Sequence, residues 1–184
     1  KFAPPFKSFS ELVAYYEKLL AAGDILRPGD LWWIIRPQPP LGTVEFRIFD
    51  IPTSVRRIGA FAALIQAAVD TYQDRFFAGI PGSEFHTGYL EENWWKAMRY
   101  GLNAKIIEPE TGEITTISEQ LRRLIELAAP KAKELHAKHH LDFARTMIEH
   151  GSESDLQRAL YKELNGDLRA LENELARRTL DFSE

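Results

Sequence analysis

Residues 31–50 read LWWIIRPQPPLGTVEFRIFD, and the organisation of the chain follows from them. Residues 31–36 and 43–49 are rich in Trp, Ile, Val and Phe, which favour β-strands. The intervening residues 37–42 contain three prolines. They cannot continue a strand, because proline donates no hydrogen bond to a neighbouring strand. We therefore predict an antiparallel hairpin over residues 31–50, closed by a proline-stiffened loop.

The second predicted strand carries charged and apolar side chains in alternation, so they point to opposite faces. One face is apolar and is expected to lie against the core: Val44, Phe46 and Ile48. Glu45 and Arg47 share the other face, and Arg36 can reach it if the hairpin pairs normally. A carboxylate and two guanidinium groups are thus predicted to project together from the hairpin.

This charged set is suited to phosphoryl transfer. A glutamate is a hard oxygen ligand for Mg²⁺ or Mn²⁺. The fork-shaped donors of arginine match phosphate oxygens, and phosphoryl transfer needs metal ions and cations around the moving group. The same residues could instead form a simple salt bridge on a solvated sheet surface. The pattern alone leaves both interpretations open.

The remainder of the chain is mainly helical. Ser8 and Glu11 have the capping-box spacing, and they predict the start of a helix that stops before Gly23. Residues 55–77 predict a long helix that is packed on several sides. Residues 78–88, with three glycines and a proline, predict a surface loop.

The C-terminal part is predicted to contain one small hairpin and several helices. A helix is expected over residues 90–100, and a hairpin over 104–116, where a Pro- and Gly-containing turn separates two short strands. From residue 118 to 180 the chain is expected to be helical, with a break at Pro130, which suits a first helical turn. Together these elements predict an α+β fold.

Composition excludes several kinds of protein. The 184 residues carry 23 Lys and Arg against 27 Asp and Glu, a net charge of -4, which argues against a nucleic-acid partner. Cysteine is absent, which excludes disulfides, a zinc–thiolate site and a cysteine nucleophile. The longest apolar run, around residues 60–69, is too short for a membrane span. We therefore expect a cytoplasmic protein without a membrane partner.

Two blocks of sequence resemble one enzyme family. Residues 31–37, followed by 42–47 and 50–53, closely resemble the signature of glutamate–cysteine ligase family 2, also called the carboxylate–amine ligases. Residues 92–104, ENWWKAMRYGLNA, are similar to that family's Asn-x-Trp-x-Ala-x-Arg-Tyr-Gly-Leu segment. The order and spacing of both blocks fit, and the resemblance covers nearly the whole chain.

The resemblance implies a reaction and the residues that serve it. It implies ATP- and Mg²⁺- (or Mn²⁺-) dependent activation of the γ-carboxylate of glutamate as an acyl phosphate, then attack by an amine such as that of cysteine. The first block also resembles, more distantly, the C-terminal strand pair of glutamine synthetases. That likeness implies part of an antiparallel sheet with a largely helical C-terminal region. It also implies that Glu45 binds metal, and that Arg36 and Arg47 hold phosphate or substrate carboxylate. Arg99 is expected either to reach the nucleotide or to neutralise the end of its helix.

Two departures from the family bear on these expectations. The family's Gly-Asn-Gly-Ala-like loop before Gln-Arg is replaced by residues 151–158, which keep only Gly151, Gln157 and Arg158. The family's enzymes are also considerably longer, and this chain begins at Lys1 rather than Met. We expect residues 1–184 to be the C-terminal half of a catalytic domain in a homo-oligomeric enzyme. Two alternatives stay open: a non-catalytic binding or assembly module, and a phosphotransferase of related fold.

Overall fold

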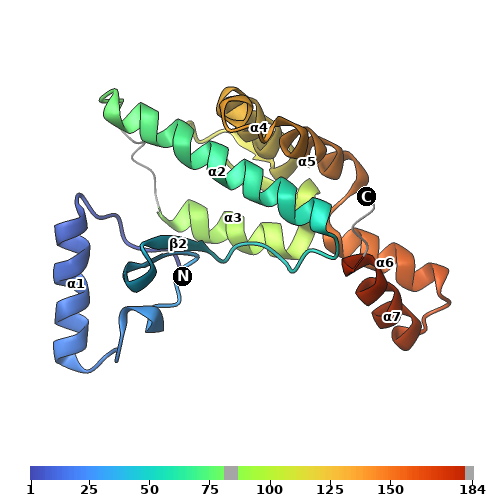
Figure 1. The fold of residues 1–184 in the computed structure, drawn as a ribbon, viewed down its shortest axis with the longest axis horizontal. Helices are drawn as coiled ribbons and strands as arrows, with labels where there is room; N and C mark the ends of the chain where they lie inside the picture. The colour runs from blue at the N-terminus through green and yellow to red at the C-terminus, as the bar shows by residue number, and fades with distance from the viewer. Residues whose placement is uncertain (81–86, 181–184) are drawn as a thin grey trace. The chain divides into compact units, whose positions relative to one another are not determined.

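The structure is a computed structural model, and it describes residues 1–80 and 87–180. The chain divides into two compact units, Lys1–Asp50 and Ile51–Glu184. Both helices and strands are present, as the α+β prediction requires (Figure 1). No helix in the described ranges is both long enough and apolar enough to cross a membrane.

Helix α1 (Phe9–Ala22) begins and ends where the sequence predicts. The Ser8 hydroxyl accepts a hydrogen bond from Glu11 N at 3.2 Å, and Gly23 ends the helix in the left-handed conformation, with a φ of 77°. The helix packs on Trp33, which is only 5% exposed and lies among the rings of three aromatic residues: Phe6, Tyr15 and Tyr16. This aromatic cluster forms the core of the first unit together with the buried side chains of Leu12 and Ile25.

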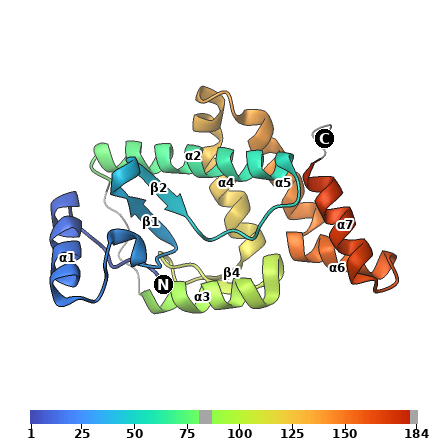
Figure 2. The same ribbon diagram turned by 60° about the horizontal axis from the view of Figure 1, so that its bottom comes forward.

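The predicted hairpin is present, with different strand boundaries. Strands β1 (Ile35–Gln38) and β2 (Thr43–Phe46) are antiparallel, and the short 3₁₀ helix η2 (Pro39–Leu41) lies between them (Figure 2). The prediction that Pro37 could not belong to a strand is wrong. Arg47 N donates to Ile34 O at 2.8 Å, and hydrogen-bonded pairs alternate along an antiparallel ladder. Pro37 therefore falls opposite Val44 at a position where no ladder hydrogen bond is needed.

Most of the predicted apolar face of the hairpin is exposed, and Phe46 alone of its three residues is half-buried. Val44 is 53% exposed and Ile48 is 51% exposed, contrary to the prediction that this face is the core side. The physical reason is that the described ribbon has only two strands, and a two-stranded ribbon buries little of either face.

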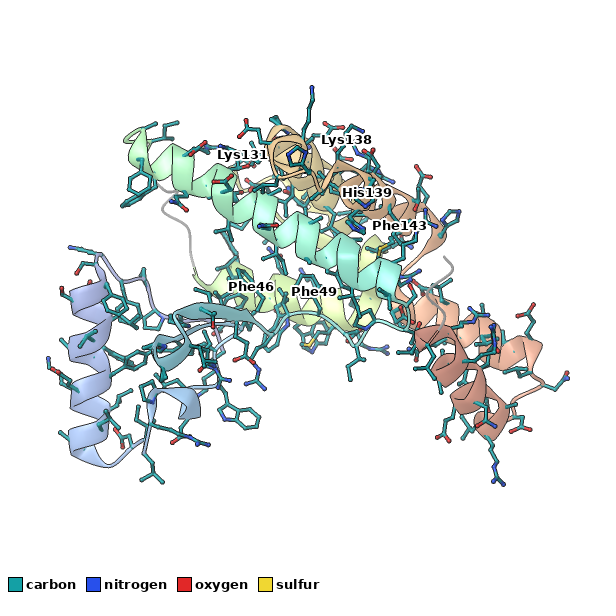
Figure 3. All side chains as sticks on the ribbon, viewed as in Figure 1. Phe46, Phe49, Lys131, Lys138, His139 and Phe143 are labelled. Atoms are coloured by element: carbon teal, nitrogen blue, oxygen red, sulfur yellow. The ribbon has the colours of Figure 1, made fainter. Side chains whose placement is uncertain are left out.

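The core of the second unit is a three-helix packing of α2 (Val55–Phe77), α4 (Ile117–Glu134) and α5 (Lys138–His150), which lie side by side in Figures 1 and 2. Its buried residues are mostly small or aliphatic: Ala60, Leu64, Ala67, Ile125, Ala128, Ala132, Leu141 and Ala144. At the edge of this core, Lys131 of α4 pairs with Asp74 of α2 at 2.6 Å and with Glu134 at 3.1 Å (Figure 3). These hydrogen-bonded carboxylates raise the pKa of Lys131, so it stays protonated.

The predicted break at Pro130 is wrong, because α4 continues through it to Glu134. A proline inside a helix removes one backbone hydrogen bond and commonly kinks the chain. Here Ala128 and Ala132, on either side of Pro130, are fully buried against the neighbouring helices. Tertiary packing thus holds the last turn of α4 in place. The chain then reverses at His136, whose φ is 57°, before α5 begins.

The second family-like block forms a helix that is joined to a small sheet. Helix α3 (Thr87–Tyr100) is followed by η3 (Gly101–Asn103), and β3 (Lys105–Ile107) pairs with β4 (Ile114–Thr116), which confirms the predicted hairpin. Asn93, 8% exposed, donates to Ile107 O at 2.6 Å and accepts from Ile107 N at 3.0 Å. Its amide thus pairs with the free edge of β3.

Two helices end the described chain. Helices α6 (Glu153–Glu163) and α7 (Leu168–Thr179) pack on each other and confirm that the C-terminal region is helical. Most of the loop predicted over residues 78–88 lies outside the described residues.

Gly59 provides a test of close packing between α2 and α5. A Cβ added there would lie 2.7 Å from His140 Nδ1 and 2.8 Å from Cε1. We expect Gly59→Ala to destabilise the protein by about 1 kcal/mol, because overpacking outweighs the gain in helix propensity. Chemical denaturation measures this. In a His140→Ala background the same change should stabilise, and Gly88→Ala, where a Cβ meets open space, is the matched control. A stabilising Gly59→Ala in the wild-type background would contradict the packing.

Asn93 provides a test of the helix–sheet junction. We expect Asn93→Ala to lower the free energy of unfolding by about 2 kcal/mol, because it leaves the N–H and C=O of Ile107 without partners. Thermal or urea unfolding gives the value. The control, Asn173→Ala on the exposed side of α7, should change stability by less than about 0.5 kcal/mol. Equal effects of the two substitutions would argue against this role.

Candidate functional site

The register of the hairpin brings two residues of opposite charge face to face. Arg36 pairs with Glu45 directly across the ribbon, and both side chains lie on one face. Arg36 Nε and Nη2 lie 2.9 and 2.5 Å from Glu45 Oε2. Arg47 joins them from two residues along β2, with its Nε 3.4 Å from Glu45 Oε1. The prediction that these three residues share a face is confirmed.

Arg36 is held from several directions. Its side chain is only 12% exposed, and its Nη1 donates to the carbonyl oxygens of Gly29 and Leu31. These carbonyls lie in and just after the 3₁₀ helix η1 (Pro28–Asp30). Because its donors contact Glu45 and the backbone together, Arg36 fixes the orientation of the Glu45 carboxylate.

Sequence reasoning missed Gln38 as a member of this site. Gln38 Nε2 donates to Glu45 Oε2 at 2.8 Å. Residue 38 follows Arg36 by two positions, so it lies on the same face of an extended strand. The signal was therefore present in the spacing. It was hidden by the assumption that Pro37 had to end the strand.

Arg47 is more weakly engaged than Arg36. Its guanidinium carbon lies 5.1 Å from the centre of the Trp32 ring, a cation–π contact on an indole that is itself 73% exposed. The long contact to Glu45 and the exposed stacking partner leave its remaining N–H donors available for an anion. The net charge of Arg36, Arg47 and Glu45 together is positive, which favours an anionic ligand.

The donors around Glu45 set its protonation state. Hydrogen bonds from Arg36 and then Gln38 hold the pKa of Glu45 below its usual range, and the charges of Arg36 and Arg47 add to this effect. The carboxylate is therefore anionic at neutral pH. Oε2 accepts from Arg36 and Gln38, whereas the contact to Oε1 is the longer one from Arg47. Oε1 is thus the oxygen better placed to take a cation.

The described residues contain no separate cluster of side chains that could hold a metal ion by itself. Nowhere in the two described ranges do three or more His, Cys, Asp or Glu side chains gather as a metal site would require. Arg99 lies in the second unit, in the last turn of α3, with its guanidinium 5.7 Å from the Tyr100 ring. It is not a member of the Glu45 cluster within the ribbon. The ligand-binding roles of the four predicted site residues stay predictions: Arg36, Glu45, Arg47 and Arg99.

Comparison with known proteins gives the same family as the two sequence blocks. The glutamate-cysteine ligase family 2 profile matches residues 2–174. A relative from Frankia alni, provisionally named glutamate–cysteine ligase 2-1, is 34% identical over 164 residues, which are 89% of this chain and 43% of the relative. A Thermobifida fusca relative with the provisional name glutamate–cysteine ligase 2 is 34% identical over 81% of this chain and 37% of its own length.

A third relative extends the match along almost the whole chain. The protein from Chloroflexus aggregans, also provisionally named glutamate–cysteine ligase 2, is 29% identical over 97% of this chain and 45% of its own length. The chain thus spans less than half the length of these curated relatives. Since the family profile covers all but the ends of the chain, the chain belongs to glutamate-cysteine ligase family 2.

Proposed function

We propose that the protein to which this chain belongs is an ATP-dependent carboxylate–amine ligase that forms a γ-glutamyl amide. The observation that carries the proposal is the ionised Glu45 carboxylate held between Arg36 and Arg47 on one face of the β1–β2 ribbon. Family membership supports a ligase. Glutamate, an amine such as cysteine, and ATP are the proposed substrates.

The proposed chemistry needs no covalent enzyme intermediate. An oxygen of the γ-carboxylate of glutamate attacks the γ-phosphorus of ATP, and the bond to the ADP oxygen breaks. The amine nitrogen then attacks the acyl carbon, phosphate leaves, and the nitrogen gives up a proton. Both steps place negative charge on phosphate oxygens, which preorganised cations stabilise.

The ribbon can supply part of the coordination shell of a divalent cation. Mg²⁺ commonly takes one or two carboxylates and completes its shell with water and substrate phosphates. Glu45 would supply one such carboxylate through Oε1, the oxygen with the longer contact. When bound, the cation would neutralise phosphate charge.

The two arginines are proposed to act differently. Arg47 is the proposed phosphate-binding residue, because its donors are exposed and loosely engaged. Arg36 is the proposed positioning residue, because its fork already contacts Glu45 and two backbone carbonyls. A phosphate contact by Arg36 would require one of these bonds to be released. Nucleotide contact by Arg99, a glutamine-synthetase-like sheet that extends the ribbon, a homo-oligomer and a cytoplasmic location stay predictions from the sequence.

Replacing the carboxylate tests the proposed function. In the full-length protein, Glu45→Gln should lower the metal-dependent rate of phosphate release from ATP, with glutamate and cysteine present, by about 10²-fold or more. Glu113→Gln, an exposed glutamate beside β4, is the control and should keep the wild-type rate. Product analysis distinguishes a γ-glutamyl amide plus phosphate from a stable phosphorylated product. Near wild-type turnover by Glu45→Gln would sink the assignment of Glu45.

The pKa of Glu45 is a second test. Because the pKa is lowered in the folded protein, the contribution of this cluster to stability is complete above the usual glutamate pKa of about 4.3. It is lost as the pH falls through the lowered value. The carboxyl carbon shift of Glu45, followed by NMR against pH, should titrate below the usual range. Arg36→Gln should move the pKa upward, whereas Arg27→Gln, which removes the exposed ion pair with Asp30, should not. An ordinary wild-type value would contradict the geometry.

A further inference from the structure

A cavity lies in the second unit, between the N-terminal end of α2 and helices α6 and α7. Its volume is about 130 Å³. The polar lining comes from both sides of this junction: Thr53, Ser54, Arg57, Glu153, Gln157 and Arg178. Phe143 of α5, labelled in Figure 3, adds an apolar wall together with Leu160 and Leu175. The cavity is therefore amphipathic.

Two buried charges face each other in this cavity. Arg57 and Glu153 are each only 8% exposed, and Arg57 Nη1 lies 3.5 Å from Glu153 Oε2. A charge-assisted hydrogen bond between such groups is normally about 2.7–2.9 Å long. Thr53 Oγ1 donates to Glu153 Oε1 at 2.5 Å, but Glu153 Oε2 accepts no hydrogen bond. One oxygen of a buried carboxylate is thus left without a donor.

A buried carboxylate oxygen destabilises the folded protein unless it accepts a hydrogen bond. Burying an ionised group without hydrogen bonds is strongly unfavourable, and a buried pair needs good geometry to compensate. Arg57 has five N–H donors on its guanidinium, and the pair with Glu153 is loose. The cavity therefore offers an acceptor and several donors at one place, and the walls beside them are apolar.

We propose that this cavity binds a small α-amino acid as its zwitterion. The ammonium group donates to Glu153 Oε2, the carboxylate accepts from Arg57, and a short side chain lies against Phe143 and Leu160. Arg178, which also lines the cavity, is already paired with Glu174 at 2.9 Å. A zwitterion therefore leaves the buried Arg57–Glu153 pair electrically balanced, whereas an anion or a cation alone would add an unpaired charge. The volume is close to the roughly 150 Å³ cavity that holds benzene, a ligand of about six heavy atoms. L-Alanine has that size.

Binding of L-alanine to the full-length protein, without ATP or metal, tests the proposal. Saturation-transfer NMR should detect L-alanine, and N-acetyl-L-alanine and L-alaninamide should not compete, because each lacks one of the two charges. Glu153→Gln should weaken binding about tenfold or more. Asp142→Asn, an exposed carboxylate paired with Lys138, is the matched control and should bind as the wild type does.

A second variant removes the space and keeps the charges. Leu175→Phe should fill the cavity and abolish L-alanine binding with the Arg57–Glu153 pair intact. Glu45→Gln should leave L-alanine binding unchanged, so failure of the ligase proposal and failure of this one are separable. No detectable binding to the wild type up to about 10 mM would overturn the proposal. Binding that persists in both Glu153→Gln and Leu175→Phe would also overturn it, because the ligand would then lie elsewhere.

Discussion

The candidate site depends on the antiparallel register that sets Arg36 directly opposite Glu45. In a two-stranded ribbon, residues two apart share a face, so this one pairing also brings Gln38 and Arg47 to the same carboxylate. A shift of one residue would turn one strand's charged side chains to the opposite face. The chemistry of the ribbon therefore follows from its register more than from any single residue.

The first unit stabilises that register through its aromatic core. Trp33 is buried against α1, and the next residue, Ile34, accepts the hydrogen bond from Arg47 N that begins the ladder. Arg36 is then tied to the carbonyls of Gly29 and Leu31. The apolar contact of Trp33 thus supports the polar contacts of Arg36, three residues further along the chain, and keeps a charged cluster ordered on a partly exposed surface.

In the second unit, a residue of the family-like motif has a structural role. Asn93, which lies in the block shared with the family, pairs with both backbone groups of Ile107 and joins α3 to β3. Glu153, at the start of α6, instead contributes a buried charge to a cavity. A motif match identifies the family, but contacts decide what each residue in it does.

The sequence by itself determined most of the helices, the two hairpins, the shared face of Arg36, Glu45 and Arg47, and the family, because strand alternation, capping residues and long motifs are local signals. Only the tertiary structure decided that Pro37 belongs to β1, that Pro130 lies inside α4, and that Val44 is exposed. It also brought Arg57 and Glu153 together across nearly a hundred residues. The physical reason is that register, helix continuity and buried ion pairs depend on packing between distant segments, which no local pattern records.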